Sequence, residues 1–330
     1  MRVRWLLAAR CRLYPDSPRD PCAPHLQPSS TTLVLRIAFF GAGGNLTASA
    51  LRSVAGKHLV VTVVGVQPRF RTMAGRIRTV VRRSVGRLDS LERAIRDLGL
   101  TEHRMRHRAD PRVIEHVRVL RPDVICIAGF PWVLPASVLE IARIGAINLH
   151  TSLLPRHRGP MPLFWVYAHD DAETGVTVHW ATDVADAGDI IAQTVLPIAR
   201  GENIVEVHNR SCAAGALLLA IALDEIERGA SARTTQDEAR ATTEGVHKRG
   251  TSFVKFDEWD VERVWHTLAG LRSMIHEPLV DENGRALRYR AVTGYERRAH
   301  DQLPGAVRRG GAAIEVYCRG GVVTLEERLP

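Results

Sequence analysis

From residue 33 onward, short apolar runs alternate with segments of helical spacing, and this alternation limits the fold more than any other feature. Strands that alternate with helices form parallel sheets joined by right-handed crossovers. We therefore expect an α/β fold with a Rossmann-like, mostly parallel sheet. The apolar runs expected to be strands lie at 34–40, 59–66, 124–128 and 145–150, and the expected helices lie at 88–98 and 111–120.

The remaining sequence divides into an extension, a larger domain, a connector and a small domain. A chain of 330 residues exceeds one typical domain. Residues 1–32 carry five prolines and no periodic apolar face, which predicts a disordered or misannotated extension. The larger domain spans 33–229, with β-like stretches at 176–180 and 190–196 before a long helix at 204–227. A polar, Thr-rich linker follows at 230–250.

Residues 251–330 predict a small C-terminal β-barrel-like domain, similar to an OB fold. A helix near 261–271 precedes short alternating segments that are separated by glycine turns. The expected strands are at 286–291, 312–318 and 321–325.

Composition places the chain among ordinary globular proteins. The five cysteines are scattered and show no C-x-x-C spacing, so neither a disulfide framework nor a zinc knuckle is expected. No uninterrupted apolar run approaches the roughly 20 residues that cross a bilayer, and we expect a cytoplasmic protein without membrane contact. A formal net charge of +9 favours phosphorylated or polyanionic partners.

One ordered set of polar motifs carries the functional signal. The run 145–150 ends in Asn148-Leu149-His150, which continues as Thr151-Ser152-Leu153-Leu154-Pro155 and then Arg158-Gly159-Pro160. Downstream come Gly175-Val176-Thr177 and Asp186-Ala187-Gly188-Asp189-Ile190. In this order and spacing the chain resembles the folate-dependent formyltransferase family from about Leu35 to Glu227. The resemblance implies the formyltransferase fold and transfer of a formyl group from 10-formyltetrahydrofolate to a primary amine.

Asn148, His150 and Asp186 are the expected catalytic residues. When an amine attacks a formyl carbon, the carbonyl oxygen becomes an oxyanion that needs placed donors. Side chains two apart on a strand point to the same face, so Asn148 and His150 can both reach that oxygen. Asp186 is the candidate acid/base group, and its carboxylate is expected to favour the protonated form of His150.

The resemblance also implies where the cosubstrate and the acceptor bind. The pterin ring is expected between the segment containing Phe130 and Leu134 and the loop containing Thr182, Asp183 and Asp186. Ordinary core packing is an alternative role for Phe130. Acceptor contacts are expected from a glycine turn at a helix N-terminus, where free N–H groups bind anions, and from the loop after His150. The residues are Gly43, Gly44, Asn45, Ser152 and Arg158, and Arg158 could instead brace its loop.

Four histidines, at 150, 157, 169 and 179, invite a metal interpretation. Their spacing matches no familiar zinc motif, and the resembling family works without metal. We therefore expect no metal cofactor.

The acceptor remains open between two amines. Net charge and seven arginines without an acid between residues 67 and 87 favour methionyl-tRNA, as does the C-terminal region. The glycine turn and the sequence Pro160-Met161-Pro162-Leu163-Phe164-Trp165 favour a small amine such as a nucleotide-linked amino sugar. A 10-formyltetrahydrofolate hydrolase or a non-catalytic folate-binding relative is the alternative from another class. No obligate protein partner is evident.

Overall fold

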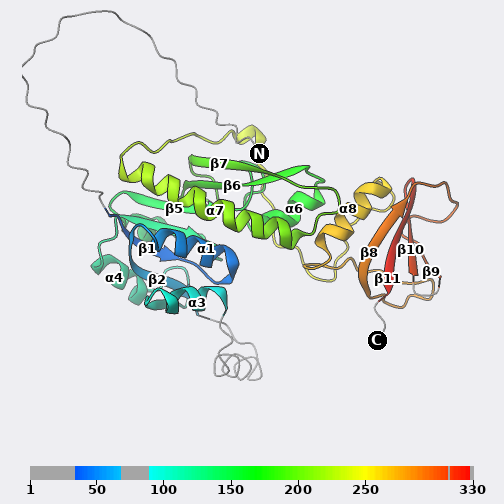
Figure 1. Ribbon diagram of the computed structural model, residues 1–330, viewed down its shortest axis with the longest axis horizontal. Coiled ribbons are helices and arrows are strands. Elements are labelled where there is room, and N and C mark those ends of the chain that lie inside the picture. The colour runs from blue at the N-terminus through cyan, green and yellow to red at the C-terminus, as the bar shows by residue number, and fades with distance from the viewer. Residues whose placement is uncertain (1–33, 68–88, 311–312, 328–330) are drawn as a thin grey trace, which may run out of the picture. The chain divides into compact units, whose positions relative to one another are not determined.

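The computed structural model describes residues 34–67, 89–310 and 313–327 (Figure 1). The predicted extension at 1–32 and almost all of the arginine-rich stretch at 67–87 lie outside the described residues. The elements are β1 Arg36–Phe40, α1 Gly44–Ala55, β2 Leu59–Val66, α3 Ser90–Asp97, β3 Glu102–Met105, α4 Pro111–Val119, β4 Val124–Ala128, α5 Ala136–Leu139, β5 Gly145–His150, α6 Pro162–Ala168, β6 Glu173–Trp180, β7 Ile190–Pro197, α7 Ile204–Glu227, η1 Glu238–Arg240, α8 Val261–Leu271, β8 Tyr289–Glu296, β9 Val307–Gly310, β10 Ala313–Cys318 and β11 Gly321–Glu327.

A seven-stranded sheet in the order β3-β2-β1-β4-β5-β6-β7 forms the larger part of the protein. The strands from β3 to β5 run parallel, whereas β6 is antiparallel to both β5 and β7. The predicted α/β class with a mostly parallel sheet is therefore confirmed. Because β1 and β4 are neighbours although β2 and β3 intervene in sequence, the chain changes direction of travel across the sheet at this pair. Crevices at such switch points are where α/β sheets bind ligands.

Both faces of the sheet are covered, which explains why its central strands are apolar throughout. Side chains of Ile37 and Phe39 enter a core under α1, α3 and α7, whereas Ala38 and Phe40 enter a second core that includes residues of α4 and α5. In Figure 1, α1 and α7 lie across the same face of the sheet. A strand buried on both faces shows no apolar–polar alternation.

The helix α7 is the one described helix that is long and apolar enough to cross a membrane, judged by length and composition alone. Its buried face includes Val207, Leu219 and Leu223, and it packs on α1 and β6. Its apolar composition is thus explained by packing over the sheet.

The C-terminal region forms a separate antiparallel sheet in the order β8-β11-β10-β9. Its core combines α8 residues such as Val264 and Leu268 with Ile314 and Val323 of the strands. A small β-barrel-like domain was predicted here, and its β class is confirmed by an antiparallel sheet of four described strands. The short strand β9 was not predicted.

Gly175 in β6 lies at a tightly packed point of the β6–β7 hairpin. A Cβ atom there would lie 2.2 Å from the Thr194 carbonyl oxygen and 2.3 Å from Leu153 Cδ2. We expect Gly175→Ala to destabilise the protein by about 1–3 kcal/mol because backbone has to move, lowering Tm by roughly 2–4 °C per kcal/mol in a circular-dichroism melt. Gly294→Ala in β8 is the matched control, because the described residues leave room there for a Cβ. Equal Tm changes in the two variants would contradict tight packing at Gly175.

Candidate active site

A cavity of about 400 Å³ opens where β4 and β5 end. Its lining includes the segment from Gly129 to Leu134, which follows β4, and Thr182, Ala185 and Asp186 from the loop after β6. Asn148 and His150 line it from β5, and His179 lines it from β6. The cavity therefore collects the polar ends of two neighbouring strands beside a largely apolar wall.

His150 ends β5, and a hydrogen bond to a main-chain carbonyl fixes the tautomer of its ring. Its Nε2 lies 2.8 Å from the carbonyl oxygen of His157, and a carbonyl can only accept, so Nε2 carries the hydrogen. In the neutral ring Nδ1 is then an acceptor. That Nδ1 lies 3.6 Å from Asp186 Oδ1. The side of His150 that faces Asp186 is therefore able to take a proton.

Asn148 lies two residues earlier on β5, opposite His179 in the antiparallel register. Its Nδ2 donates to Asp186 Oδ1 at 3.0 Å and approaches His179 Nε2 at 3.1 Å. His179 Nδ1 donates to the Trp180 carbonyl, so its Nε2 accepts from Asn148. Both amide hydrogens of Asn148 thus have protein acceptors.

Asp186 occupies a left-handed backbone conformation with φ 52°. Asp is among the few residues that adopt this region at modest cost. Its Oδ2 accepts from the Gly159 N–H at 2.8 Å, and its main-chain carbonyl accepts from Gln236 Nε2 at 2.8 Å. The turn is therefore fastened both to the loop after β5 and to a segment 50 residues downstream.

Arg158 braces this arrangement. The side chain is 7% exposed, and its guanidinium donates to Gln236 Oε1 and to both carboxylate oxygens of Glu238. Gln236 in turn donates to the Gly188 carbonyl at 2.7 Å. One connected set of bonds therefore fixes the loop after β5 and the Asp186 turn to the segment that follows α7.

Burial and neighbouring groups shift the pKa values of His150 and Asp186. Burial lowers the pKa of His150, and this effect outweighs Asp186, which raises it. Burial alone would raise the pKa of Asp186, but the charge of a protonated His150 and the Gly159 N–H hold it below its usual range. The expected influence of Asp186 on His150 is present, but the prediction of a favoured imidazolium is reversed by burial. The site holds a carboxylate beside a neutral imidazole.

The structure places most residues predicted to hold the cosubstrate in the cavity wall. Phe130, Leu134 and Thr182 line the cavity, although Leu134 also packs in the core. Asp183 is exposed and is absent from the lining. Its contact with the cosubstrate therefore stays a prediction.

The residues predicted to contact the acceptor are dispersed. Ser152 is fully buried and donates to the Arg156 carbonyl, so it shapes the loop. Arg158 donates to Gln236 and Glu238, which fits its alternative bracing role, and its contact with the acceptor stays a prediction. Asn45 accepts from Ser90 at the start of α1. The turn at Gly43 and Gly44 has positive φ at both residues, which glycine tolerates, but Leu46 is the residue of this region that reaches the cavity.

Sequence reasoning missed His179 and Gln236 as site residues. His179 was considered only as a metal ligand, and strand pairing with β5 would have been needed to place it beside Asn148. Gln236 lies in the stretch predicted to be a linker. A polar residue in a Thr-rich stretch gives no local signal that it will be buried.

Comparison with known proteins gives a consistent family. A family model described as formyl transferase matches residues 35–223. A methionyl-tRNA formyltransferase of Geotalea uraniireducens is 35% identical over 222 residues, which cover 66% of this chain and 68% of the relative. The protein of that name from Syntrophus aciditrophicus is 32% identical over 219 residues, covering 66% and 69%.

Solved structures share the fold. An N-formyltransferase from Helicobacter canadensis, solved with folinic acid and dTDP-3-aminofucose, has a TM-score of 0.62 at 13% identity and covers 90% of this chain and 100% of its own. HypX from Aquifex aeolicus, solved with tetrahydrofolic acid, has a TM-score of 0.56 at 18% identity, covering 88% and 43%. At such identities the likeness concerns the fold alone.

Asp186→Asn is expected to destabilise the protein by about 1.5–3 kcal/mol near neutral pH, the range for hydrogen bonds to a charged group. The folded pKa is below the unfolded value of about 3.9. The contribution of the carboxylate is therefore complete above the unfolded pKa and is lost as pH falls through the folded pKa. Urea unfolding of both proteins between about pH 7 and pH 3 measures this difference.

The wild-type advantage over Asp186→Asn should shrink toward acid. Asn keeps the shape of the side chain and its tolerance of positive φ, so backbone strain is matched between the two proteins. Asp189→Asn, three residues along the chain, serves as the control for a carboxylate outside the cluster. An advantage that stays constant with pH would show that the carboxylate of Asp186 is not held as an anion.

Proposed function

This chain belongs to the formyl transferase family, and on that premise we propose that it transfers a formyl group from 10-formyltetrahydrofolate to a primary amine, best matched by the amino group of methionyl-tRNA. The observation that carries the proposal is the cluster at the end of β5. The proton-accepting Nδ1 of His150 lies 3.6 Å from the Asp186 carboxylate. The amide of Asn148 contacts that same carboxylate at 3.0 Å.

The proposed reaction breaks one C–N bond and forms another. The amine nitrogen attacks the formyl carbon, the C–N bond to the folate nitrogen breaks, and one proton passes from the amine to that leaving nitrogen. Neutral His150 accepts the proton at Nδ1, and the ionised Asp186 stabilises the resulting imidazolium. Tetrahydrofolate leaves once its nitrogen has received the proton.

The oxyanion is met by the donors closest to it. An Asn148 N–H can turn from His179 or Asp186 toward the oxygen, and a protonated His150 Nδ1–H adds a second, charged donor. Because His150 is buried and Asn148 is half-buried, each donor is worth more there than in bulk water. The set stabilises the transition state more than the ground state, as catalysis requires.

The folate is proposed to lie along the apolar wall. Phe130, Trp132 and Leu134 line one side of the cavity and Thr182 lines the other. Flat apolar walls with a few polar groups are typical of sites for cofactor-sized rings. Structures of two relatives of this fold contain folate derivatives, namely folinic acid in the Helicobacter canadensis enzyme and tetrahydrofolic acid in HypX.

Methionyl-tRNA is proposed as the acceptor because of the names of the relatives and the positive net charge of the chain. Relatives that are 32–35% identical carry the name methionyl-tRNA formyltransferase. The chain has a net charge of +9 and seven arginines without an acid between residues 67 and 87, which suits a phosphate backbone. A nucleotide-linked amino sugar is the second candidate, because a sugar N-formyltransferase is matched over its whole length. Hydrolysis gains no support from these relatives.

His150→Ala is expected to lower kcat by at least about 100-fold, the scale of losing an acid/base group or an oxyanion donor. Asp186→Asn should have a similar effect, with KM for folate changing much less than kcat. Stopped assays that quantify tetrahydrofolate and formylated product measure both constants. Asp189→Asn is the control, and near-normal turnover in both site variants would reject the catalytic assignment.

The acceptor is tested with 10-formyltetrahydrofolate and either methionyl-tRNA or a panel of nucleotide-linked amino sugars. We expect formyl-methionyl-tRNA and stoichiometric tetrahydrofolate, with the rate falling steeply as salt rises because phosphate contacts are screened. Turnover only with an amino sugar would show that the acceptor is a small amine and would leave the proposed formyl transfer unchanged. Tetrahydrofolate release without any amine would instead identify a hydrolase.

A further inference from the structure

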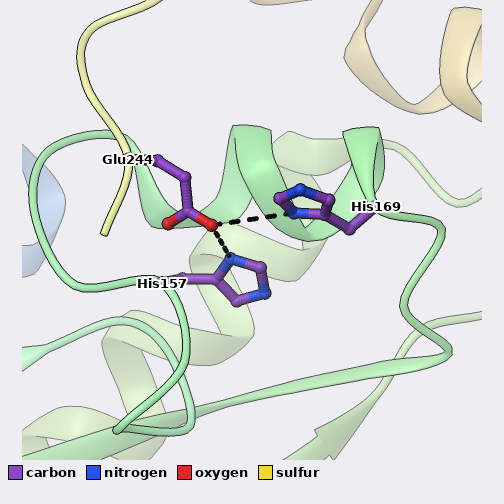
Figure 2. A group of neighbouring side chains, drawn as sticks. All are labelled: His157, His169 and Glu244. Carbon is purple, nitrogen blue, oxygen red and sulfur yellow. Dashed lines mark hydrogen bonds and ion pairs between the residues drawn. The ribbon is translucent and has the colours of Figure 1, made fainter. Parts of the chain in front are cut away.

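Three side chains outside the catalytic cluster converge on one point. Figure 2 shows the rings of His157 and His169 beside the same carboxylate oxygen of Glu244. His157 Nδ1 lies 3.3 Å from Glu244 Oε1, and His169 Nδ1 lies 3.8 Å from that atom. One ligand atom from each residue lies within 4.8 Å of the others. Ligand atoms bound tetrahedrally to zinc at about 2.0–2.1 Å are about 3.3 Å apart, so small side-chain shifts would complete such a site.

The opposite nitrogen of His157 is already engaged in the way that metal-binding histidines are. Its Nε2 lies 2.7 Å from Asp171 Oδ2, and because a carboxylate accepts, Nε2 carries the hydrogen. The neutral ring then presents an Nδ1 lone pair to Glu244. A carboxylate that orients the far side of a ligating imidazole is a recurrent companion of metal sites.

Charge balance calls for a cation between these groups. Two acceptors, His157 Nδ1 and Glu244 Oε1, face each other at 3.3 Å, so a proton or a metal ion must separate them. The rings of His157 and His169 stack with centroids 5.4 Å apart, which disfavours two imidazolium ions. A single divalent ion serves both neutral rings.

Glu244 adds an independent sign of a missing partner. Its side chain is 11% exposed, and its Oε2 is buried without a hydrogen-bond partner among the described residues. A buried carboxylate oxygen left unpaired is costly. A cation at Oε1 would balance the charge of this carboxylate, and it would also engage Oε2 if the carboxylate bound it through both oxygens.

We propose that His157, His169 and Glu244 bind one divalent transition-metal ion, with zinc as the best match, at a structural site that the histidine spacing did not predict and that is not a cofactor of the reaction. Two imidazole nitrogens and one carboxylate oxygen are ligands that zinc accepts, and they leave a position for water. His169 is 44% exposed on its side chain, whereas His157 is 3% exposed. The ion therefore enters from solvent past His169 and rests against buried His157 and Glu244.

The ion would tie three parts of the chain together. His157 belongs to the loop after β5, His169 caps the end of α6, and Glu244 belongs to the segment after α7. The carbonyl of His157 accepts from His150 Nε2. The site therefore acts as a positioning clamp behind the catalytic histidine rather than as a participant in formyl transfer.

The test uses the full chain, stripped with a chelator and then titrated with zinc by calorimetry and with cobalt by visible absorption. We expect one saturable site, a cobalt spectrum typical of four ligands, and a rise in Tm with zinc. His169→Gln and Glu244→Gln should each weaken zinc binding by at least about 100-fold. Asp171→Asn should weaken it by about 10–100-fold, the range for a residue that orients a ligand.

His116→Gln is the control, because His116 stacks on His103 in a histidine pair remote from the cluster. His169→Gln alters a half-exposed side chain, and its Tm without metal reports whether the fold is intact. The proposal is overturned if the stripped protein takes up no stoichiometric zinc, which would leave a proton as the ion between His157 and Glu244. It is equally overturned if His169→Gln and Glu244→Gln bind zinc as the wild type does.

Discussion

The carboxylate of Asp186 is the interaction on which the site depends. One oxygen accepts from Asn148 of β5 and the other from the Gly159 N–H, while the main chain of the same residue is held by Gln236. These three partners come from a strand, the loop after it and a segment beyond α7. Because the backbone at Asp186 is left-handed, the turn needs all of these contacts to keep its shape. An anion is thus held at the end of β5 by donors that exist only in the folded chain.

The fold was predictable where burial leaves a simple mark. The runs at 59–66, 124–128 and 145–150 match strands β2, β4 and β5, since strands covered on both faces are mostly apolar. The edge strand β3, Glu102–Met105, was missed because most of its side chains are only partly buried and polar. The helix α6, Pro162–Ala168, was missed because it is short and apolar on nearly all sides, although Pro162 at its first turn is a helix-start signal.

Only the site residues that belong to one strand or one local motif could be predicted from the sequence. Asn148 and His150 were found because they share one strand face, and Asp186 was found through its motif. His179, Gln236 and Glu244 reach the same region through strand register and through a return of the chain after α7. Ionisation could not be inferred from pairing alone: the sequence indicates that Asp186 faces His150, but burial decides which form of the imidazole dominates.

The segment after α7 packs against the loop after β5 and against the Asp186 turn, and it helps to hold both in place. Sequence composition predicts a connector at 230–250, yet the backbone there pairs with Ile190 through Thr234 and with Arg158 through Thr243. Its side chains add Gln236 under the Asp186 turn and Glu244 beside His157. Gly159 is required at the crossing, because a Cβ would lie 2.6 Å from the Glu244 carbonyl and φ is 98°. The loop whose carbonyl accepts from His150 Nε2 is therefore built jointly with this segment, and a change in either one alters the geometry of both.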